Sequence, residues 1–339
     1  MRGRIFRPIV GGLMALVLTG TMAAYGSTDD VGSSSGQGGK KDVKEVKIGF
    51  LQRQMDAPYY TAMVNNAKAQ AGKDGFDLQV QDAGGDPVKQ LDQAQTMQAQ
   101  GVDVIVIDAI SPETQRQQLT GIAKQTPVVF VDTGIPNVGV TSVTSNNSEI
   151  GKQSGKLTAE RIGSGTQITM AILNGGANDE IVGPARQQGF LDGLTEGGVK
   201  YDIVAEAPAM WAQDKAVPAA ESMLAAHPDV DLVLGLNDAM ALGALTVLRD
   251  QKNTKTLVAA SSDGQKEALR EIKDGGCEGQ YVSTGLNSPD LAGARAMEVA
   301  VQLATGEATK DQFKPEEYTK AAGINCKNID EFYDPNSEF

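Results

Sequence analysis

Nine polar and aromatic residues stand just after short apolar runs of the sequence, or in the segments that follow these runs. They are Asp56, Tyr59, Tyr60, Asp132, Arg186, Trp211, Asn237, Asp263 and Asn287. A carboxylate accepts hydrogen bonds from two neighbouring hydroxyls, an amide both donates and accepts, and a guanidinium donates in a fixed fork. Aromatic faces cover the apolar C–H side of a sugar ring or cyclitol. This set favours a polyhydroxylated ligand, and three aspartates against one arginine disfavour a phosphate or carboxylate.

Each of these residues also has an ordinary structural interpretation. An Asp or Asn after a strand often caps the next helix or forms an Asx turn. Tyr59 and Tyr60 fit the packing of a helix start, Trp211 fits a half-buried surface cover, and Arg186 fits a surface ion pair. The binding hypothesis therefore depends on the combination and not on any single member.

The sequence lacks the patterns that are typical of an active site. The commonest general base near neutral pH is histidine, and it occurs once, as His227 in AAHPDVD, where it fits a solvated helix end. No G-x-G-x-x-G follows the first apolar run, GKQSGK is one residue short of a phosphate loop, and G-x-S-x-G and H-E-x-x-H are absent. We predict no catalytic residue, no metal and no cofactor, and therefore no enzyme.

From Val46 onward, short β-branched runs alternate with longer runs of helical spacing. Strands are predicted over residues 46–51, 77–82, 102–108, 127–132, 167–174, 201–206, 231–237, 256–261, 279–285 and 318–324. Strands that alternate with helices predict βαβ units and parallel sheets, and apolar strands indicate helices on both faces. The expected fold class is α/β, with two doubly wound, Rossmann-like lobes. Ligands bind such sheets beyond the carboxyl ends of the strands, where the nine residues stand.

The composition is that of a soluble globular protein, with 40% hydrophobic and 22% charged residues in a chain of 339. This length allows two domains. The formal net charge of −13 repels phosphate backbones, so we expect no nucleic acid among the partners. Nothing in the sequence indicates oligomers, and we expect a monomer.

The first 26 residues have the pattern of a secretory signal. Arg2, Arg4 and Arg7 precede an apolar run over 9–24, which ends in small residues. The segment TMAAYGS resembles the lipid-attachment box of bacterial lipoproteins, but Tyr25 stands where that box needs its cysteine. Export is expected, either with cleavage or with an uncleaved tether. Residues 27–45 are Gly/Ser-rich and charged, and we predict a disordered tether there.

The chain has two cysteines, Cys277 and Cys326. Two thiols are too few for a structural zinc site. In an exported protein a disulfide between them is the natural expectation, and two separate buried thiols are the alternative.

Several segments of the chain resemble the ribose-binding-protein-like group of bacterial type I periplasmic binding proteins. They are APYY, QDAGGDPVKQLDQAQTMQAQGVDVIVID, PVVFVD, ARQQGF, AHPDVDLVLGLNDAMALGAL and SSDG. The resemblance runs from about Val46 to Lys320. It implies the substrate-binding component of an ABC sugar importer, with a permease and an ATPase as partners, in the periplasm or at the outer face of the cytoplasmic membrane.

The resemblance also implies two lobes that close around the ligand. Residues 46–146 plus 287–318 would form the N-terminal lobe, and 147–286 plus 319–339 the C-terminal lobe. The chain would cross between them near Asn146, Leu286 and Tyr318.

By position, the first lobe or hinge would contribute Asp56, Tyr59, Tyr60, Asp132 and Asn287, and the second lobe Arg186, Trp211, Asn237 and Asp263. Ribose binders usually have Asn where this chain has Ala57, and Arg where it has Thr133. Without that amide and that guanidinium, we expect weaker ribose binding or a different preferred sugar. A polyol, a cyclitol or another aldose is an equally good expectation.

Two other kinds of protein share this resemblance. A repressor of the lactose-repressor type would need an N-terminal helix-turn-helix, where this chain has a signal pattern and a Gly/Ser-rich stretch. A sensor that presents its ligand-bound form to a membrane receptor would share both fold and site, and this alternative stays open.

Overall fold

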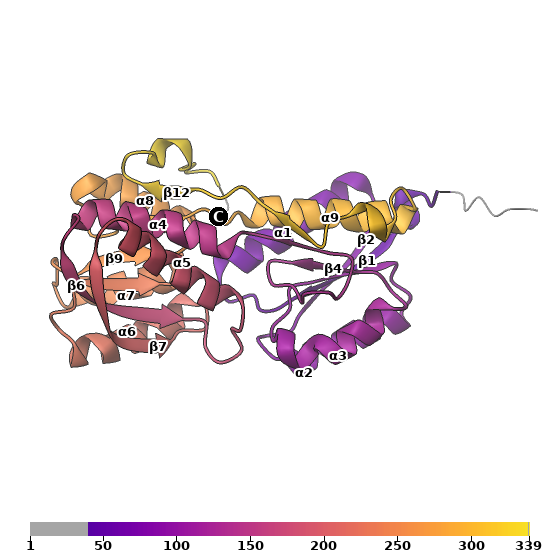
Figure 1. Cartoon of the computed structure of the whole chain (residues 1–339). Helices are drawn as coiled ribbons and strands as arrows, with labels where there is room; N and C mark the ends of the chain where they lie inside the picture. Colours follow the sequence, from indigo (N-terminus) through magenta and orange to yellow (C-terminus); the bar gives the residue numbers. More distant parts are fainter. Residues whose placement is uncertain (1–39, 338) are drawn as a thin grey trace, which may run out of the picture. The chain divides into compact units, whose positions relative to one another are not determined.

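The computed structural model describes residues 40–337 and 339 (Figure 1). The predicted signal segment, residues 1–26, lies outside the described residues. The described residues form one compact unit. Within the described part of the chain, no helix is long and apolar enough to cross a membrane.

The last residues of the predicted tether are ordered. Val43–Glu45 form a short 3-10 helix, η1. The ammonium group of Lys41 donates to Asp103 Oδ1 at 2.7 Å, and the Lys41 backbone N–H donates to Thr305 O at 3.0 Å. The tether boundary at Glu45 is therefore predicted too late, because charged residues that look solvated in the sequence have partners in the folded chain.

One sheet has six parallel strands in the order β11-β5-β4-β3-β1-β2. The strands are β1 (Lys47–Gln52), β2 (Asp77–Asp82), β3 (Val104–Ile107), β4 (Val128–Val131), β5 (Thr141–Thr144) and β11 (Glu316–Tyr318). Alternate residues of β3 belong to two different buried clusters, Val104 and Val106 to one and Ile105 and Ile107 to the other. Both faces of this sheet are therefore covered, as its uninterrupted apolar strands predict.

Four helices cover the six-stranded sheet. They are α1 (Pro58–Asp74), α2 (Pro87–Ala99), α3 (Pro112–Ala123) and α9 (Pro289–Thr305). Helices α1 and α9 pack together on one face, and α2 and α3 on the other (Figure 1). Each of these helices begins with a proline, whose fixed φ suits the first helical turn. These prolines therefore set the points at which the chain turns from strand into helix.

A second sheet has four parallel strands in the order β7-β6-β8-β9. The strands are β6 (Gln167–Asn174), β7 (Lys200–Pro208), β8 (Leu232–Gly235) and β9 (Leu257–Ala260). The helices that accompany it are α4 (Asn147–Ile162), α5 (Val182–Glu196), α6 (Gln213–Ala226), α7 (Asp238–Asp250) and α8 (Lys266–Gly275). Helices α4 and α5 approach so closely that a Cβ at Gly155 would lie 2.2 Å from Phe190 O. Glycine at this position therefore sets the spacing of the two helices.

The chain passes between the two sheets at three places. It leaves β5 for α4, which packs on α5; it leaves β10 (Ser283–Gly285) for α9; and it leaves β11 for β12 (Gly323–Asn325), which pairs antiparallel with β10. The strand predicted over 318–324 is wrong, since residues 319–322 connect two short strands. Strand β5 was not predicted, because its sequence TSVT carries no apolar run.

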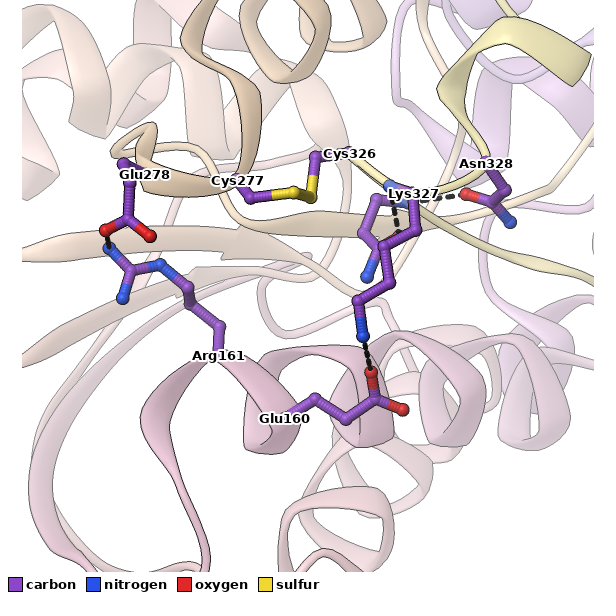
Figure 2. Close-up of a disulfide and its surroundings, with 8 residues drawn as sticks. Glu160, Arg161, Cys277, Glu278, Cys326, Lys327 and Asn328 are labelled. Atoms are coloured by element: carbon purple, nitrogen blue, oxygen red, sulfur yellow. Dashed lines mark hydrogen bonds and ion pairs between the residues drawn. A yellow bond between two sulfur atoms is a disulfide. The ribbon is translucent and has the colours of Figure 1, made fainter.

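The predicted disulfide is confirmed. Cys277, in the 3-10 helix η2 (Gly276–Glu278), is bonded to Cys326, with 5.1 Å between the two Cα atoms. Figure 2 shows two ion pairs beside it, Arg161 with Glu278 at 3.2 Å and Lys327 with Glu160 at 2.7 Å. The bond joins the segment after α8 to the segment after β12.

Candidate functional site

A small cavity of about 10 Å³ lies beyond the carboxyl ends of strands from both sheets. Such a volume has room for about one water molecule, so the lining side chains nearly fill the site in this structure. Its lining residues are Arg53, Tyr59, Tyr60, Asp132, Val182, Arg186, Trp211, Asn237 and Asp263. Seven of the nine residues that the sequence singles out are thus brought together. The other two, Asp56 and Asn287, do not line the cavity.

Arg186 and Asp263 form a buried ion pair inside this cavity. Arg186 Nη1 lies 3.1 Å from Asp263 Oδ1, and both side chains are only 4% exposed. Arg186 Nε donates to Asn147 Oδ1 at 2.8 Å, and the guanidinium carbon lies 5.3 Å from the ring centroid of Trp211. A surface ion pair, the ordinary interpretation of Arg186, does not fit this burial. The guanidinium is held in one orientation by partners from three separate segments of the chain.

Asp263 is positioned by a second buried carboxylate, Asp238, at the first position of α7. Asp238 Oδ2 accepts hydrogen bonds from the backbone N–H groups of Asp263, Gly264 and Gln265 at 3.0, 2.6 and 2.7 Å. The Tyr281 hydroxyl donates to Asp238 Oδ1 at 2.6 Å. Burial, and after it the charge of Asp263, raises the pKa of Asp238 to about 6. Asp238 therefore orders the loop that presents Asp263.

The side of the cavity next to the six-stranded sheet is built from the first turn of α1 and the end of β4. The Tyr59 hydroxyl donates to Asp132 Oδ1 at 2.8 Å, and its oxygen lies 3.2 Å from Asn287 Oδ1. The rings of Tyr59 and Tyr60 meet edge to face, with centroids 5.6 Å apart. Burial raises the pKa of both phenols well above 10. Both hydroxyls therefore stay protonated at neutral pH.

Asp132 adopts a backbone conformation that few aspartates adopt. Its φ is 58°, in the left-handed region, and its backbone carbonyl accepts a hydrogen bond from Thr144 Oγ1 at 2.6 Å. Non-glycine residues in sparsely populated regions cluster at ligand sites and are held there by their surroundings. The conformation turns the chain at the strand end and brings the carboxylate to the cavity.

Trp211 and Asn237 line the cavity next to the four-stranded sheet. Asn237 Oδ1 caps α7 by accepting from the Met240 N–H at 2.9 Å, and its Nδ2 donates to Trp211 O at 3.2 Å. Asn237 is thus a helix cap as well as a lining residue. Trp211 has a φ of 64° and is buried, and its indole Nε1–H has no hydrogen-bond partner among the described residues.

Asn287 lies directly behind the lining residues. Its Nδ2 donates to Asp263 Oδ1 at 3.1 Å, and its Oδ1 accepts from Ser145 Oγ at 2.6 Å. The amide is 1% exposed and connects the Asp263 loop with the end of β5. Its contacts in this structure are those of a positioning residue.

Asp56 is exposed, and the structure does not place it in the cavity. Its carboxylate accepts from Gln54 Nε2 at 2.7 Å, and the same nitrogen lies 3.2 Å from Met210 O. Asp56 precedes Ala57, the N-cap residue of α1. The prediction of Asp56 as a ligand contact is therefore not supported by its position.

Sequence reasoning missed two charged residues at the cavity, Arg53 and Asp108. Arg53 lines the cavity, and Asp108, fully buried, lies 3.9 Å from Arg53 Nη1 through its Oδ1. Neither carboxylate oxygen of Asp108 has a hydrogen-bond partner among the described residues. Thr133 lies nearby and favours the charged form of Asp108. Burial, and after it Asp132, raises the pKa of Asp108 well above its usual value. Both residues stand at strand ends, so applying the strand-end rule to every charged residue would have found them.

Comparisons with known proteins identify the family of the chain. A family model described as a periplasmic binding protein domain matches residues 48–308 of the chain. The chain belongs to this family. The predicted fold class, a type I periplasmic binding protein with parallel sheets, is thereby confirmed.

Curated relatives and solved structures agree with the family. The ribose import binding protein RbsB of Salmonella typhimurium is 28% identical over 269 residues, 78% of this chain and 87% of the relative. The D-apiose import binding protein of Paraburkholderia graminis is 26% identical over 290 residues, 83% of this chain and 86% of the relative. A solute-binding protein of an ABC transporter from Mycobacterium smegmatis, solved with glycerol, is 31% identical, with a TM-score of 0.78. That likeness covers 87% of this periplasmic binding protein and 99% of the solved chain.

Proposed function

We propose that this periplasmic binding protein captures a monosaccharide, or a small polyol or cyclitol, and delivers it to the permease of an ABC importer. The observation that carries the proposal is the buried Arg186–Asp263 pair inside a small cavity lined by Trp211. Buried polar groups are costly unless they are paired. A ligand with neighbouring hydroxyls would bridge the pair and accept from the free indole N–H.

The charges at the cavity favour a neutral ligand. Arg53 and Arg186 face Asp132 and Asp263, and Asp108 lies behind Arg53. Two guanidiniums against at least two carboxylates leave no net positive charge for an anion. A sugar phosphate or sugar acid would bring a buried negative charge without a counter-charge. Burying one such ion costs several kcal/mol. Neutral polyols avoid this cost.

The names of the relatives support the same class of ligand. They are import binding proteins for ribose and D-apiose, and the solved neighbours include one from Caulobacter with bound myo-inositol, 25% identical, as well as the glycerol complex. All four of these molecules carry adjacent hydroxyl groups, and none of them is charged. For this chain we propose a ligand of this neutral, polyhydroxylated class. We also propose that its partners are a permease and an ATPase. The protein itself would be monomeric, exported and without catalytic activity.

We also propose that the two sheets with their helices are lobes that close on the ligand. The lobes would comprise residues 46–146 plus 287–318 and residues 147–286 plus 319–339. The lining residues come from both, so closure would complete the hydrogen-bonding shell.

A thermal-shift panel tests this function. The purified chain from residue 27 onward is heated with each of a set of aldoses, polyols, cyclitols, amino acids and nucleosides. A ligand at 100 times its dissociation constant adds about 2.7 kcal/mol and shifts the midpoint by several degrees. We expect a shift with at least one neutral sugar or polyol. Shifts with amino acids or nucleosides alone would contradict the proposed ligand class.

A further inference from the structure

Arg53 lies at the end of β1, and its charged side chain lines the cavity. Its side chain is 7% exposed, and Nη1 donates to Thr133 Oγ1 at 3.2 Å. Its Nε is buried without a hydrogen-bond partner among the described residues. A guanidinium has five N–H donors, and the one at Nε is left for another acceptor. Leaving such donors unpaired in a closed site is costly, and a ligand oxygen would relieve that cost.

Asp108 is the buried carboxylate that supplies the counter-charge for Arg53, and it lies behind the residues that line the cavity. It follows β3, it is fully buried, and it does not line the cavity. Its distance of 3.9 Å from Arg53 Nη1 is an ion-pair distance but exceeds that of a hydrogen bond. Asp108 therefore compensates the charge of Arg53 without occupying its remaining donors.

Arg53 also changes the meaning of two departures in the sequence. Ala57 and Thr133 lack the amide and the guanidinium that ribose binders usually have, and the sequence therefore predicts weaker ribose binding or a different preferred sugar. The structure brings a guanidinium to Thr133 from another strand, and the small Thr133 side chain holds it through its hydroxyl. A guanidinium is thus present on this side of the cavity, but it comes from position 53 and not from position 133.

We propose that Arg53 is a specificity-determining residue, which donates hydrogen bonds to hydroxyl oxygens of the ligand from the side of the six-stranded sheet. Arg186 donates from α5 of the other sheet, so the preferred ligand carries neighbouring hydroxyl pairs toward both guanidiniums. This inference rests on the proposed binding of a neutral polyol. It adds that the ranking among polyols depends on Arg53.

The test is calorimetric titration of the full protein with ribose, glycerol, xylitol and myo-inositol. The variants are Arg53→Gln and, as a matched control, Arg249→Gln, which removes a guanidinium paired with Glu271 at the exposed surface. We expect Arg53→Gln to lower the affinity for the best of these probes at least tenfold and to change the ranking of the four. We expect Arg249→Gln to bind like the wild type.

Arg53→Gln leaves Asp108 buried without its counter-charge, so the double variant Arg53→Gln/Asp108→Asn is measured beside it, and unfolding midpoints report whether each variant is folded. A folded variant with wild-type affinities and ranking would overturn the role of Arg53 while leaving the proposed function standing. A wild-type protein that binds none of the four probes but binds an amino acid or nucleoside would overturn the proposed function, and the inference with it.

Discussion

Glu180, in the loop before α5, accepts a hydrogen bond from the Ser111 hydroxyl at 2.9 Å through its Oε1. Its Oε2 accepts from the Glu113 backbone N–H at 2.8 Å. Ser111 is the N-cap residue of α3 but makes no side-chain cap of its own. A carboxylate that belongs to the four-stranded sheet's loops therefore caps a helix of the six-stranded sheet.

We predict that Glu180→Ala weakens ligand binding and speeds ligand release. If the lobes open, Glu180 leaves the N-terminus of α3, so its contacts stabilise the closed form alone. Losing a helix N-cap costs about 0.5–2 kcal/mol, or about twofold to thirtyfold in affinity. Stopped-flow dissociation of the best ligand of the panel measures the effect. Glu307→Ala, at the exposed Lys40–Glu307 pair, is the control and should release ligand at the wild-type rate.

Arg186→Ala and Asp263→Ala should each weaken binding at least tenfold. Each change strands the other member of a buried pair, at roughly 1–3 kcal/mol or more, and about 1.4 kcal/mol corresponds to a factor of ten. Calorimetry of both variants, after circular dichroism has shown that they fold, measures the loss. Near-native affinity in both would show that the ligand binds elsewhere.

One physical rule was enough to predict most of the site residues from the sequence. Strands of parallel sheets present their carboxyl ends at one edge, so residues after apolar runs, such as Asp132, Asn237 and Asp263, meet at the cavity. Arg53 follows β1, so the same rule reaches it, but its contact with Thr133, eighty residues away in the sequence, could not be predicted. Pairing across strands is not visible in a single sequence.

Errors in the fold prediction have a similar origin. Residues 319–322 carry a strand-like pattern but connect two sheets, and a connection of this kind has no local signature. Asp56 lies next to the N-cap residue of α1 but is exposed, and exposure depends on packing that the local sequence does not show. Direction and long-range pairing are properties of the packed chain.

Removing the disulfide should lower stability without removing the site. The bond closes a loop between residues 49 positions apart, and such bonds typically contribute about 2–4 kcal/mol by restricting the unfolded chain. We expect urea unfolding of the Cys277→Ser/Cys326→Ser variant to show a free energy of unfolding lower by about that amount. Thiol titration of the unfolded, unreduced wild type should find no free thiol at these two positions, and two free thiols would contradict the pairing.

Asp238 should make the ligand-free protein more stable in mild acid. Its pKa is raised by burial from 3.8 to about 6 in the folded state, so between these values the folded protein binds more protons than the unfolded chain. The free energy of unfolding then falls as pH rises from about 4 to 6, at about 1.4 kcal/mol per unit of pKa difference. Urea unfolding at several pH values should show a weaker dependence in Asp238→Asn. An unchanged pH dependence would contradict the assignment.

Trp211 is the single tryptophan of the chain, and it lies against the Arg186 guanidinium in the cavity. Its fluorescence therefore reports on the proposed site alone. The most direct test of the account is a titration of the wild-type protein and Asp263→Ala with ribose, glycerol, xylitol and myo-inositol. We predict a saturable change in the emission of the wild type with at least one of these polyols, and none at the same concentrations in Asp263→Ala. Polyol binding that calorimetry detects but that leaves Trp211 emission unchanged, or that Asp263→Ala retains, would contradict this site.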